Sequence, residues 1–462
     1  MREISLLLNH RYDLNSSEPN QQLDIPVSVK LAIEARLEVV DPATFRVLQL
    51  AAVLGREISE EELVAACENM LEIDPSDSIA RIVDSGIMAS NEQTGQLRFN
   101  HALIRQTIYE SIKTSELPEH HYAAVKAIER QRGKRAEQQP SYLAQHYWIA
   151  RSVAGLSKYA HYEVLAALEQ MESFTSDDVR SRFEIILEFP IDEIAPRDRA
   201  LAWFGLAKST WFQSAGSPEN LMGSNAVINE CHANAFYGFL ESGDIESALM
   251  VATHISPDYL NPETMRVLQA ADQLSGDNTR TSIRIKLAIV VVGYFNEEVR
   301  SDGESPTLKE LSRILNLARR NQDVDLEKEV LSNDARIRVD LLDLQAGIDR
   351  SLHYLALSEA GEQYADSNDP HFQTSRAYAA LGDLNLARVH APMSSRISTS
   401  LEHNILTSQW HAMNWSLAIC EGDWDAARAV LPGMRQWAEE SQITGSSIDN
   451  SIRVLEAYLD AM

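Results

Sequence analysis

The feature that most constrains the fold of this chain is a short pattern, Gly-Asp-x-x-x-Ala, which occurs three times in its second half. The copies begin at Gly243, Gly382 and Gly422. Glycine readily ends a helix in the left-handed backbone conformation, aspartate caps the helix that follows, and a small alanine lets two helices pack closely. Each copy therefore predicts a turn between two helices that lie side by side.

A looser copy, Gly347-Ile-Asp-Arg-Ser-Leu352, indicates that the pattern repeats. The glycines at positions 347, 382 and 422 are 35 and 40 residues apart. Such a spacing is typical of tetratricopeptide-like arrays of helix pairs. We therefore expect residues 155–462 to form a tetratricopeptide-like α-solenoid. In that array the alanines of the three full copies should be buried, namely Ala248, Ala387 and Ala427.

The first part of the chain carries different signals. Asp41-Pro42 and Ser59-Glu-Glu-Glu62 are typical helix starts, the second as a capping box. The only clear strand signal lies around residues 87–99, where two short apolar runs flank a polar turn with Gly95, and it predicts one small β-hairpin. Three helices, a hairpin and a further helix are the outline of a winged-helix domain.

The expected architecture is therefore an all-α protein with one small hairpin. We predict a winged-helix-like domain at residues 25–115, a helical connector at 116–154, and the helical repeat array at 155–462. The apolar run Leu287–Phe295 is about half as long as a membrane-spanning helix, so it predicts a buried helix instead. The chain has 3 cysteines, far apart and without a Cys-x-x-Cys pair. We expect a cytoplasmic protein with no membrane contact.

Charge argues against a nucleic-acid partner. The chain has 68 Asp and Glu against 41 Lys and Arg, for a formal net charge of −27. Such a surface repels phosphates. Residues 59–85, where a DNA-reading helix is expected, carry eight acidic residues and one basic residue, Arg81. Direct nucleic-acid binding is not expected, and a ligand-sensing DNA-binding regulator that uses the winged helix is the alternative hypothesis.

Residues 25–150 resemble a known family. Ile25–Val29, Ile33–Leu37 and Val47–Gly55 are similar to the segment after the ATPase core in the signal-transduction ATPases with numerous domains, in particular the large ATP-binding regulators of the LuxR type and their cyclase-linked relatives. Leu97–Tyr109 looks like the family's stretch after the wing. The resemblance implies a modular regulator with an ATPase switch, a winged helix that clamps it, a helical sensor and often an output domain.

The sequence differs from such a regulator in two parts, the ATPase and the output domain. No Gly-x-x-x-x-Gly-Lys-Ser/Thr loop occurs, and the only Gly-Lys step, Gly133-Lys134, is followed by arginine. Ser451–Met462 has the pattern of another repeat helix and not of an output module. We therefore expect a non-catalytic regulatory or sensor portion that acts through a protein partner, for which a separate ATPase subunit is one candidate, and that needs no cofactor. The chain is then either a truncated gene product or one subunit of a split regulator.

His101 is the one candidate binding residue. The resemblance implies that a histidine at this place reaches a nucleotide phosphate, which here requires an ATPase supplied by another chain. The alternative is a structural histidine at a helix N-terminus, and both interpretations stay open. His120, His121 and His146 lack an HExxH pattern or paired cysteines, so we predict no metal site and interpret them as surface or helix-capping residues.

Two further observations concern catalysis and the aromatic residues near the C-terminus. No Gly-x-Ser-x-Gly elbow or other nucleophile motif occurs, so the protein is not expected to be an enzyme. Four tryptophans cluster near the C-terminus, and packing between helix pairs is favoured over a role as binding anchors. These are Trp410, Trp415, Trp424 and Trp437.

Overall fold

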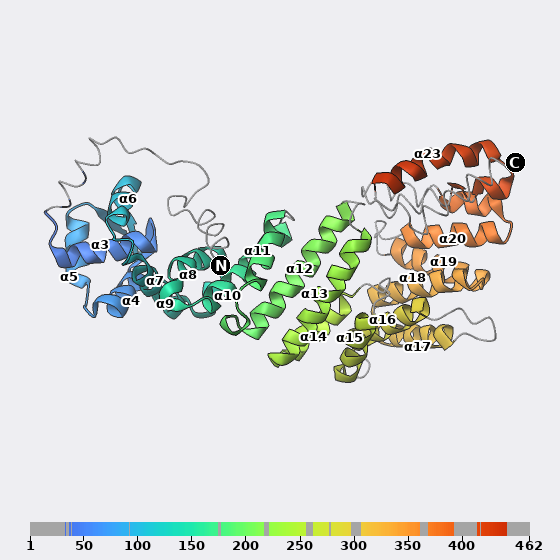
Figure 1. Ribbon diagram of the computed structural model, residues 1–462, viewed down its shortest axis with the longest axis horizontal. Helices are drawn as coiled ribbons and strands as arrows, with labels where there is room; N and C mark the ends of the chain where they lie inside the picture. The colour runs from blue at the N-terminus through green and yellow to red at the C-terminus, as the bar shows by residue number, and fades with distance from the viewer. Residues whose placement is uncertain are drawn as a thin grey trace. The chain divides into compact units, whose positions relative to one another are not determined.

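The computed structural model shows a predominantly helical chain (Figure 1). It divides into two compact units, Met1–Ala202 and Trp203–Met462. The residues that the structure describes are 33, 37, 39–91, 93–173, 177–216, 221–255, 262–276, 279–296, 306–360, 368–391, 414–415 and 417–440.

The first unit begins with helices around a small sheet. Strands β2 and β3 form the predicted hairpin, and β1 pairs antiparallel with the other edge of β3. The expectation that strands are confined to residues 87–99 is therefore wrong. Three residues with one buried side chain, Ile58, are too short to show an alternating pattern. In chain order the elements are α3 (Pro42–Leu54), β1 (Glu57–Ser59), α4 (Glu60–Leu71), α5 (Ser76–Asp84), β2 (Met88–Asn91), β3 (Gln96–Phe99) and α6 (Ala102–Glu110).

Both predicted helix starts are confirmed, since α3 begins at Pro42 and α4 at Glu60, but only the first has the predicted side-chain cap. The Asp41 carboxylate accepts hydrogen bonds from the backbone N–H groups of Ala43 (3.1 Å) and Thr44 (3.0 Å), so the predicted cap of α3 is confirmed. Ser59 precedes α4 but makes no side-chain cap bond. The capping box was wrong because its glutamate has another partner: the buried Glu62 carboxylate accepts from Nε of Arg132 at 2.6 Å.

Further helices complete the first unit. Leu143, Tyr147 and Ala150, which follow one another at helical spacing, are all buried. A buried ion pair, Arg182 Nε to Glu163 Oε1 at 2.6 Å, joins two of the helices, α10 and α11. The elements are α7 (Leu117–Arg132), η1 (Gly133–Gln138), α8 (Pro140–Ile149), α9 (Arg151–Ala154), α10 (Ser157–Ser173), α11 (Asp177–Leu187), η2 (Ile191–Glu193) and the start of α12 (Pro196–Gly216).

The second unit consists of helices that pack on their neighbours in sequence, as the stack of α18, α19 and α20 shows (Figure 1). The run Leu287–Phe295 lies in α16, and its described side chains include the fully buried Val291, so the prediction of a buried helix is confirmed. No helix in the described ranges is long and apolar enough to cross a membrane. After α12 follow α13 (Leu221–Glu241), α14 (Ile245–Thr253), α15 (Pro262–Leu274), α16 (Arg280–Asn296), α17 (Pro306–Arg320), α18 (Val324–Asp340), α19 (Leu344–Ala360), α20 (Asn368–Ala380) and α23 (Trp424–Glu440).

The three Gly-Asp steps form the predicted turns. Gly243, Gly382 and Gly422 lie between helices with φ of 76°, 84° and 72°, in the left-handed region. In each turn the aspartate N–H donates to the carbonyl five residues earlier at 2.9 Å, and its carboxylate accepts a backbone N–H of the next helix. The alanines of the pattern are fully buried, as predicted: Ala248, Ala387 and Ala427.

The looser copy was placed wrongly. Gly347 lies inside α19, and the left-handed residue of that turn is Leu342, with φ of 64°. Asp343 follows it and donates to the Arg338 carbonyl at 2.8 Å, as in the other turns. Gly347 therefore takes the place of the buried alanine. The left-handed residues at 342, 382 and 422 are 40 residues apart, so these three turns of the second unit recur with a regular, tetratricopeptide-like period.

Candidate functional site

His101 lies on the surface of the first unit, immediately before α6. Its backbone is extended (φ −136°, ψ 133°), and its side chain makes no capping hydrogen bond. The carbonyl of His101 accepts from the N–H of Ile104 at 3.1 Å. His101 is exposed at the N-terminus of this helix, where the first backbone N–H groups have no partner within the helix.

Polar contacts hold α6 in place beneath His101. Nε of Arg105 donates to the carbonyl of Ala52, at the end of α3, at 2.9 Å. Burial lowers the pKa of Arg105, whose positive charge loses water there. The Tyr109 hydroxyl is 3.0 Å from Nε2 of His121 in α7. The helix that carries His101 is thus tied to α3 and α7.

The other three histidines are buried, so their interpretation as surface residues was wrong. Nδ1 of His121 is 3.0 Å from Nδ1 of His146, and Nδ1 of His120 is 2.8 Å from the Glu116 carbonyl. Burial lowers the pKa of His146 to about 3. The pKa of His121 also falls well below its usual value, chiefly through burial and then through the charge of His146. No group of three metal-ligating side chains occurs among the described residues.

The surface of α4 and α5 is strongly acidic. Its one arginine, Arg81, is 3.7 Å from the Asp41 carboxylate. The exposed acidic residues of this surface outnumber its cations, although Arg130 of α7 pairs with Glu68 at 3.2 Å, so the surface repels phosphates. These residues are Glu61, Glu68, Glu72, Asp74, Asp77 and Asp84.

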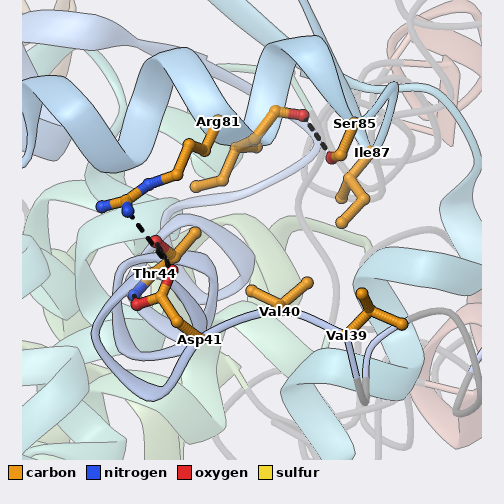
Figure 2. Close-up of a pocket in the computed structure, with 8 residues that line it drawn as sticks. Val39, Val40, Asp41, Thr44, Arg81, Ser85 and Ile87 are labelled. Atoms are coloured by element: carbon orange, nitrogen blue, oxygen red, sulfur yellow. Dashed lines mark hydrogen bonds and ion pairs between the residues drawn. The ribbon is translucent and has the colours of Figure 1, made fainter.

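A small hollow lies beside α5. Figure 2 shows the Asp41 and Arg81 side chains meeting at one side of it, with Val39, Val40 and Ile87 at the other. Its volume is about 180 Å³. The polar groups are already engaged: hydrogen bonds from Thr44 lower the pKa of Asp41. We therefore assign no ligand to this hollow.

The second unit carries a row of polar contacts on alternate helices. Helix α18 contacts both α16 and α20, and an ion pair joins it to each: Arg284 to Glu329 at 2.8 Å and Arg376 to Asp340 at 3.0 Å. Ser332 donates to Asp369 at 2.8 Å. Residues of both signs of charge therefore lie in partly exposed contacts between these helices, and we call this set of residues the polar ladder. It is defined by Arg284, Glu329, Ser332, Asp340, Asp369 and Arg376.

The tryptophans near the C-terminus take a structural role where they are described. Trp415 and Trp424 pack against a buried cluster that contains Ala427 and Leu431. The prediction of core packing is confirmed for these two. Trp410 and the side chain of Trp437 lie outside the described residues.

Comparisons with known proteins leave the family open. No protein-family model matches the chain, and no curated protein matches it. Among solved structures, the chain is similar to a signal transduction ATPase with numerous domains (STAND) protein with a tetratricopeptide repeat sensor from Pyrococcus horikoshii. The identity is 14%, the TM-score is 0.43, and the match covers 99% of this chain and 65% of that protein. It is also similar to a Rap protein complexed with competence and sporulation factor, with 10% identity, a TM-score of 0.43 and coverage of 75% and 98%. At these scores neither likeness assigns a fold or a function.

Proposed function

We propose that this chain is a non-catalytic regulatory protein that acts by binding another protein through its second unit. The observation that carries the proposal is the left-handed turn that recurs at residues 342, 382 and 422. A turn that recurs at a constant spacing stacks helix pairs side by side, and such arrays build extended surfaces that hold a partner. A protein of this kind is consistent with a cytoplasmic location.

The polar ladder is the surface that we assign to the partner. Its charges are partly exposed: Arg284 and Glu329 have side chains that are 37% and 36% exposed. The whole chain carries a net charge of −27, which favours a partner with a basic or mixed face.

For the first unit we propose a winged-helix-like domain at residues 25–115 and a helical connector at 116–154. The order of three helices and a three-stranded sheet, followed by α6, supports it. The resemblance to the ATPase regulators suggests that this domain meets an ATPase subunit on a separate chain. His101 is then the residue that reaches the nucleotide phosphate, together with the amides of the first turn of α6.

The role of His101 has a direct test. The chain alone is expected not to bind ATP at micromolar concentrations in calorimetry, because no phosphate-binding loop is encoded. With the ATPase subunit present, His101→Ala is expected to change nucleotide release from that subunit. Tight ATP binding by the isolated chain, or an unchanged release rate, contradicts this part of the proposal.

The binding proposal is tested on the polar ladder. The full chain is immobilised, a captured protein is identified, and its affinity is then measured with purified components. Glu329→Lys combined with Asp340→Lys is expected to weaken that affinity at least tenfold. The matched control is Glu310→Lys on α17, a charge outside the ladder that pairs with Arg313 at 2.8 Å. Equal affinity of both variants, with unchanged circular dichroism, contradicts the assignment.

A further inference from the structure

A chain of hydrogen bonds crosses the interior of the first unit. It runs from the Tyr109 hydroxyl to Nε2 of His121 at 3.0 Å, and from Nδ1 of His121 to Nδ1 of His146 at 3.0 Å. Both imidazoles are only 4% exposed. The chain therefore links α6, α7 and α8, and the helix that carries His101 is one of its ends.

The contact between the two rings restricts their protonation. A hydrogen bond between two Nδ1 atoms needs one N–H and one lone pair, so both rings cannot be imidazolium at once. The neutral pair satisfies the chain in either direction, with Tyr109 as donor or as acceptor. The contact between the two Nδ1 atoms is therefore compatible with a proton on one ring and breaks when both rings are imidazolium.

The surroundings of the two imidazole rings also disfavour a positive charge on them. The positive charge of Arg105 in α6 lowers the pKa of both rings, and the charge of His120 in α7 lowers the pKa of His121. From α8 the Tyr142 ring lies against His146 with 4.5 Å between ring centroids, and from α3 the carbonyl of Leu54 accepts from the Tyr142 hydroxyl.

The next groups outward, on α4 and α10, are an ion pair and uncharged aromatic rings. Glu62 of α4, whose charge acts on Tyr142, is held by Arg132. Helix α10 packs on α8 through Tyr159 and Tyr162, which contact Trp148 and Tyr147.

We propose that the His121–His146 contact is an acid-sensitive latch between α7 and α8, which opens when both rings gain protons, and that its opening loosens α6, because Tyr109 of α6 is bound to His121. Release changes the position of His101, because that residue directly precedes α6. The latch is a property of the first unit and does not depend on the proposed partner.

The direction of the pH dependence follows from the two states. In the open state the histidines regain water and titrate near pH 6.5. In the closed state their pKa values are lower, that of His146 about 3. Opening therefore takes up protons, and it becomes more favourable as the pH falls below about 6.5.

Hydrogen exchange of peptides that cover α6 tests the latch in the full chain. After correction for the intrinsic pH dependence of exchange, the opening constant is expected to rise about tenfold between pH 7.5 and 5.5 for each histidine that gains a proton. Two histidines give about a hundredfold. No rise in the wild-type chain overturns the proposal without the need for any variant.

Three variants separate titration from packing. His146→Gln removes one titrating ring, so its rise on acidification is expected to be about tenfold smaller than that of the wild type. Tyr109→Phe loosens α6 at every pH but keeps the wild-type pH dependence. His353→Gln, at a partly exposed ring on α19 of the second unit, changes neither. The same rise in His146→Gln as in the wild type also overturns the proposal.

Discussion

Gly347 in α19 and Val339 in α18 approach so closely that no side chain fits between them. A Cβ atom on Gly347 would lie 2.7 Å from Cγ2 of Val339 and 3.3 Å from the carbonyl oxygen of Ala335. Gly347 stands at the place that Ala387 and Ala427 take in the later repeats. It is therefore the tightest contact of this kind among the described turns of the array.

Gly347→Ala is expected to lower the free energy of unfolding by about 1 kcal/mol. Alanine gains about 1 kcal/mol in helix propensity, but overpacking costs about 1–3 kcal/mol. The control is Gly293→Ala in α16, where nothing lies within 4 Å of the added Cβ, and it should stabilise the chain by about 0.5–1 kcal/mol. Urea unfolding measures both, and a shift of the same sign in the two variants contradicts the account.

Leu342→Gly should stabilise the array by about 0.5–1 kcal/mol. It relieves the strain of a left-handed residue with a side chain, about 1–2 kcal/mol, which exceeds the cost of the greater flexibility of glycine in the unfolded chain. Leu342 is 76% exposed, so little packing is lost. Gly382→Ala, at the equivalent turn with φ of 84°, is the reverse control and should destabilise by about 1 kcal/mol. A destabilised Leu342→Gly variant in thermal unfolding would show that the leucine side chain makes contacts that outweigh the strain.

The turns show what the sequence could predict. The Gly-Asp steps indicated three of them, with the correct buried alanines. The turns at Gln322 and Leu342, with φ of 55° and 64°, were missed because neither residue is a glycine. At Leu342 the fold holds the strained residue through hydrogen bonds, among them Arg338 to Asp343 at 2.5 Å, and no local sequence signal reports such contacts.

The candidate site was predictable only in part. A helix start at His101 followed from the pattern and from the family resemblance. The contact between His121 and His146 did not, since it depends on how α7 packs against α8. One signal was present: His146 follows Leu143 at helical spacing, on the face that is buried, which favours a buried ring over an exposed one.

Asp334→Asn is expected to destabilise the second unit by about 3 kcal/mol. The Asp334 carboxylate is fully buried and accepts from Nε of Arg338 at 2.6 Å and Nε of Arg350 at 2.7 Å. Its loss leaves Arg350 without this buried counter-charge and Arg338 with only the more exposed Asp343. Asp340→Asn, in a partly exposed pair with Arg376, should cost about 0–1 kcal/mol. Similar urea midpoints for the two variants would contradict the burial argument.

His371→Gln should make the second unit less sensitive to acid. Nδ1 of His371 is 2.9 Å from Nδ1 of His390, and burial, followed by the charge of His390, lowers the pKa of His371 to about 4. The unfolded value is about 6.5. The stability from this neutral ring is therefore complete above pH 6.5 and is lost progressively as the pH falls towards 4.

The measurement for this pair is the difference in urea midpoint between pH 7.5 and 5.0. It should be smaller in His371→Gln than in the wild type, and the exposed-ring variant His101→Gln should behave like the wild type. An equal or larger difference in His371→Gln would exclude a contribution from the pair.

Hydrogen exchange on an Ala387→Leu variant tests the central claim, that the second unit is an array of repeats. Ala387 is fully buried against Ala391 and Leu417, so leucine should overpack this contact at a cost of about 1–3 kcal/mol. Because each repeat leans only on its neighbours, exchange should rise first at residues 368–391 and 417–440, while the first unit keeps its protection. A uniform loss of protection across the described residues would show one cooperative unit and contradict the account.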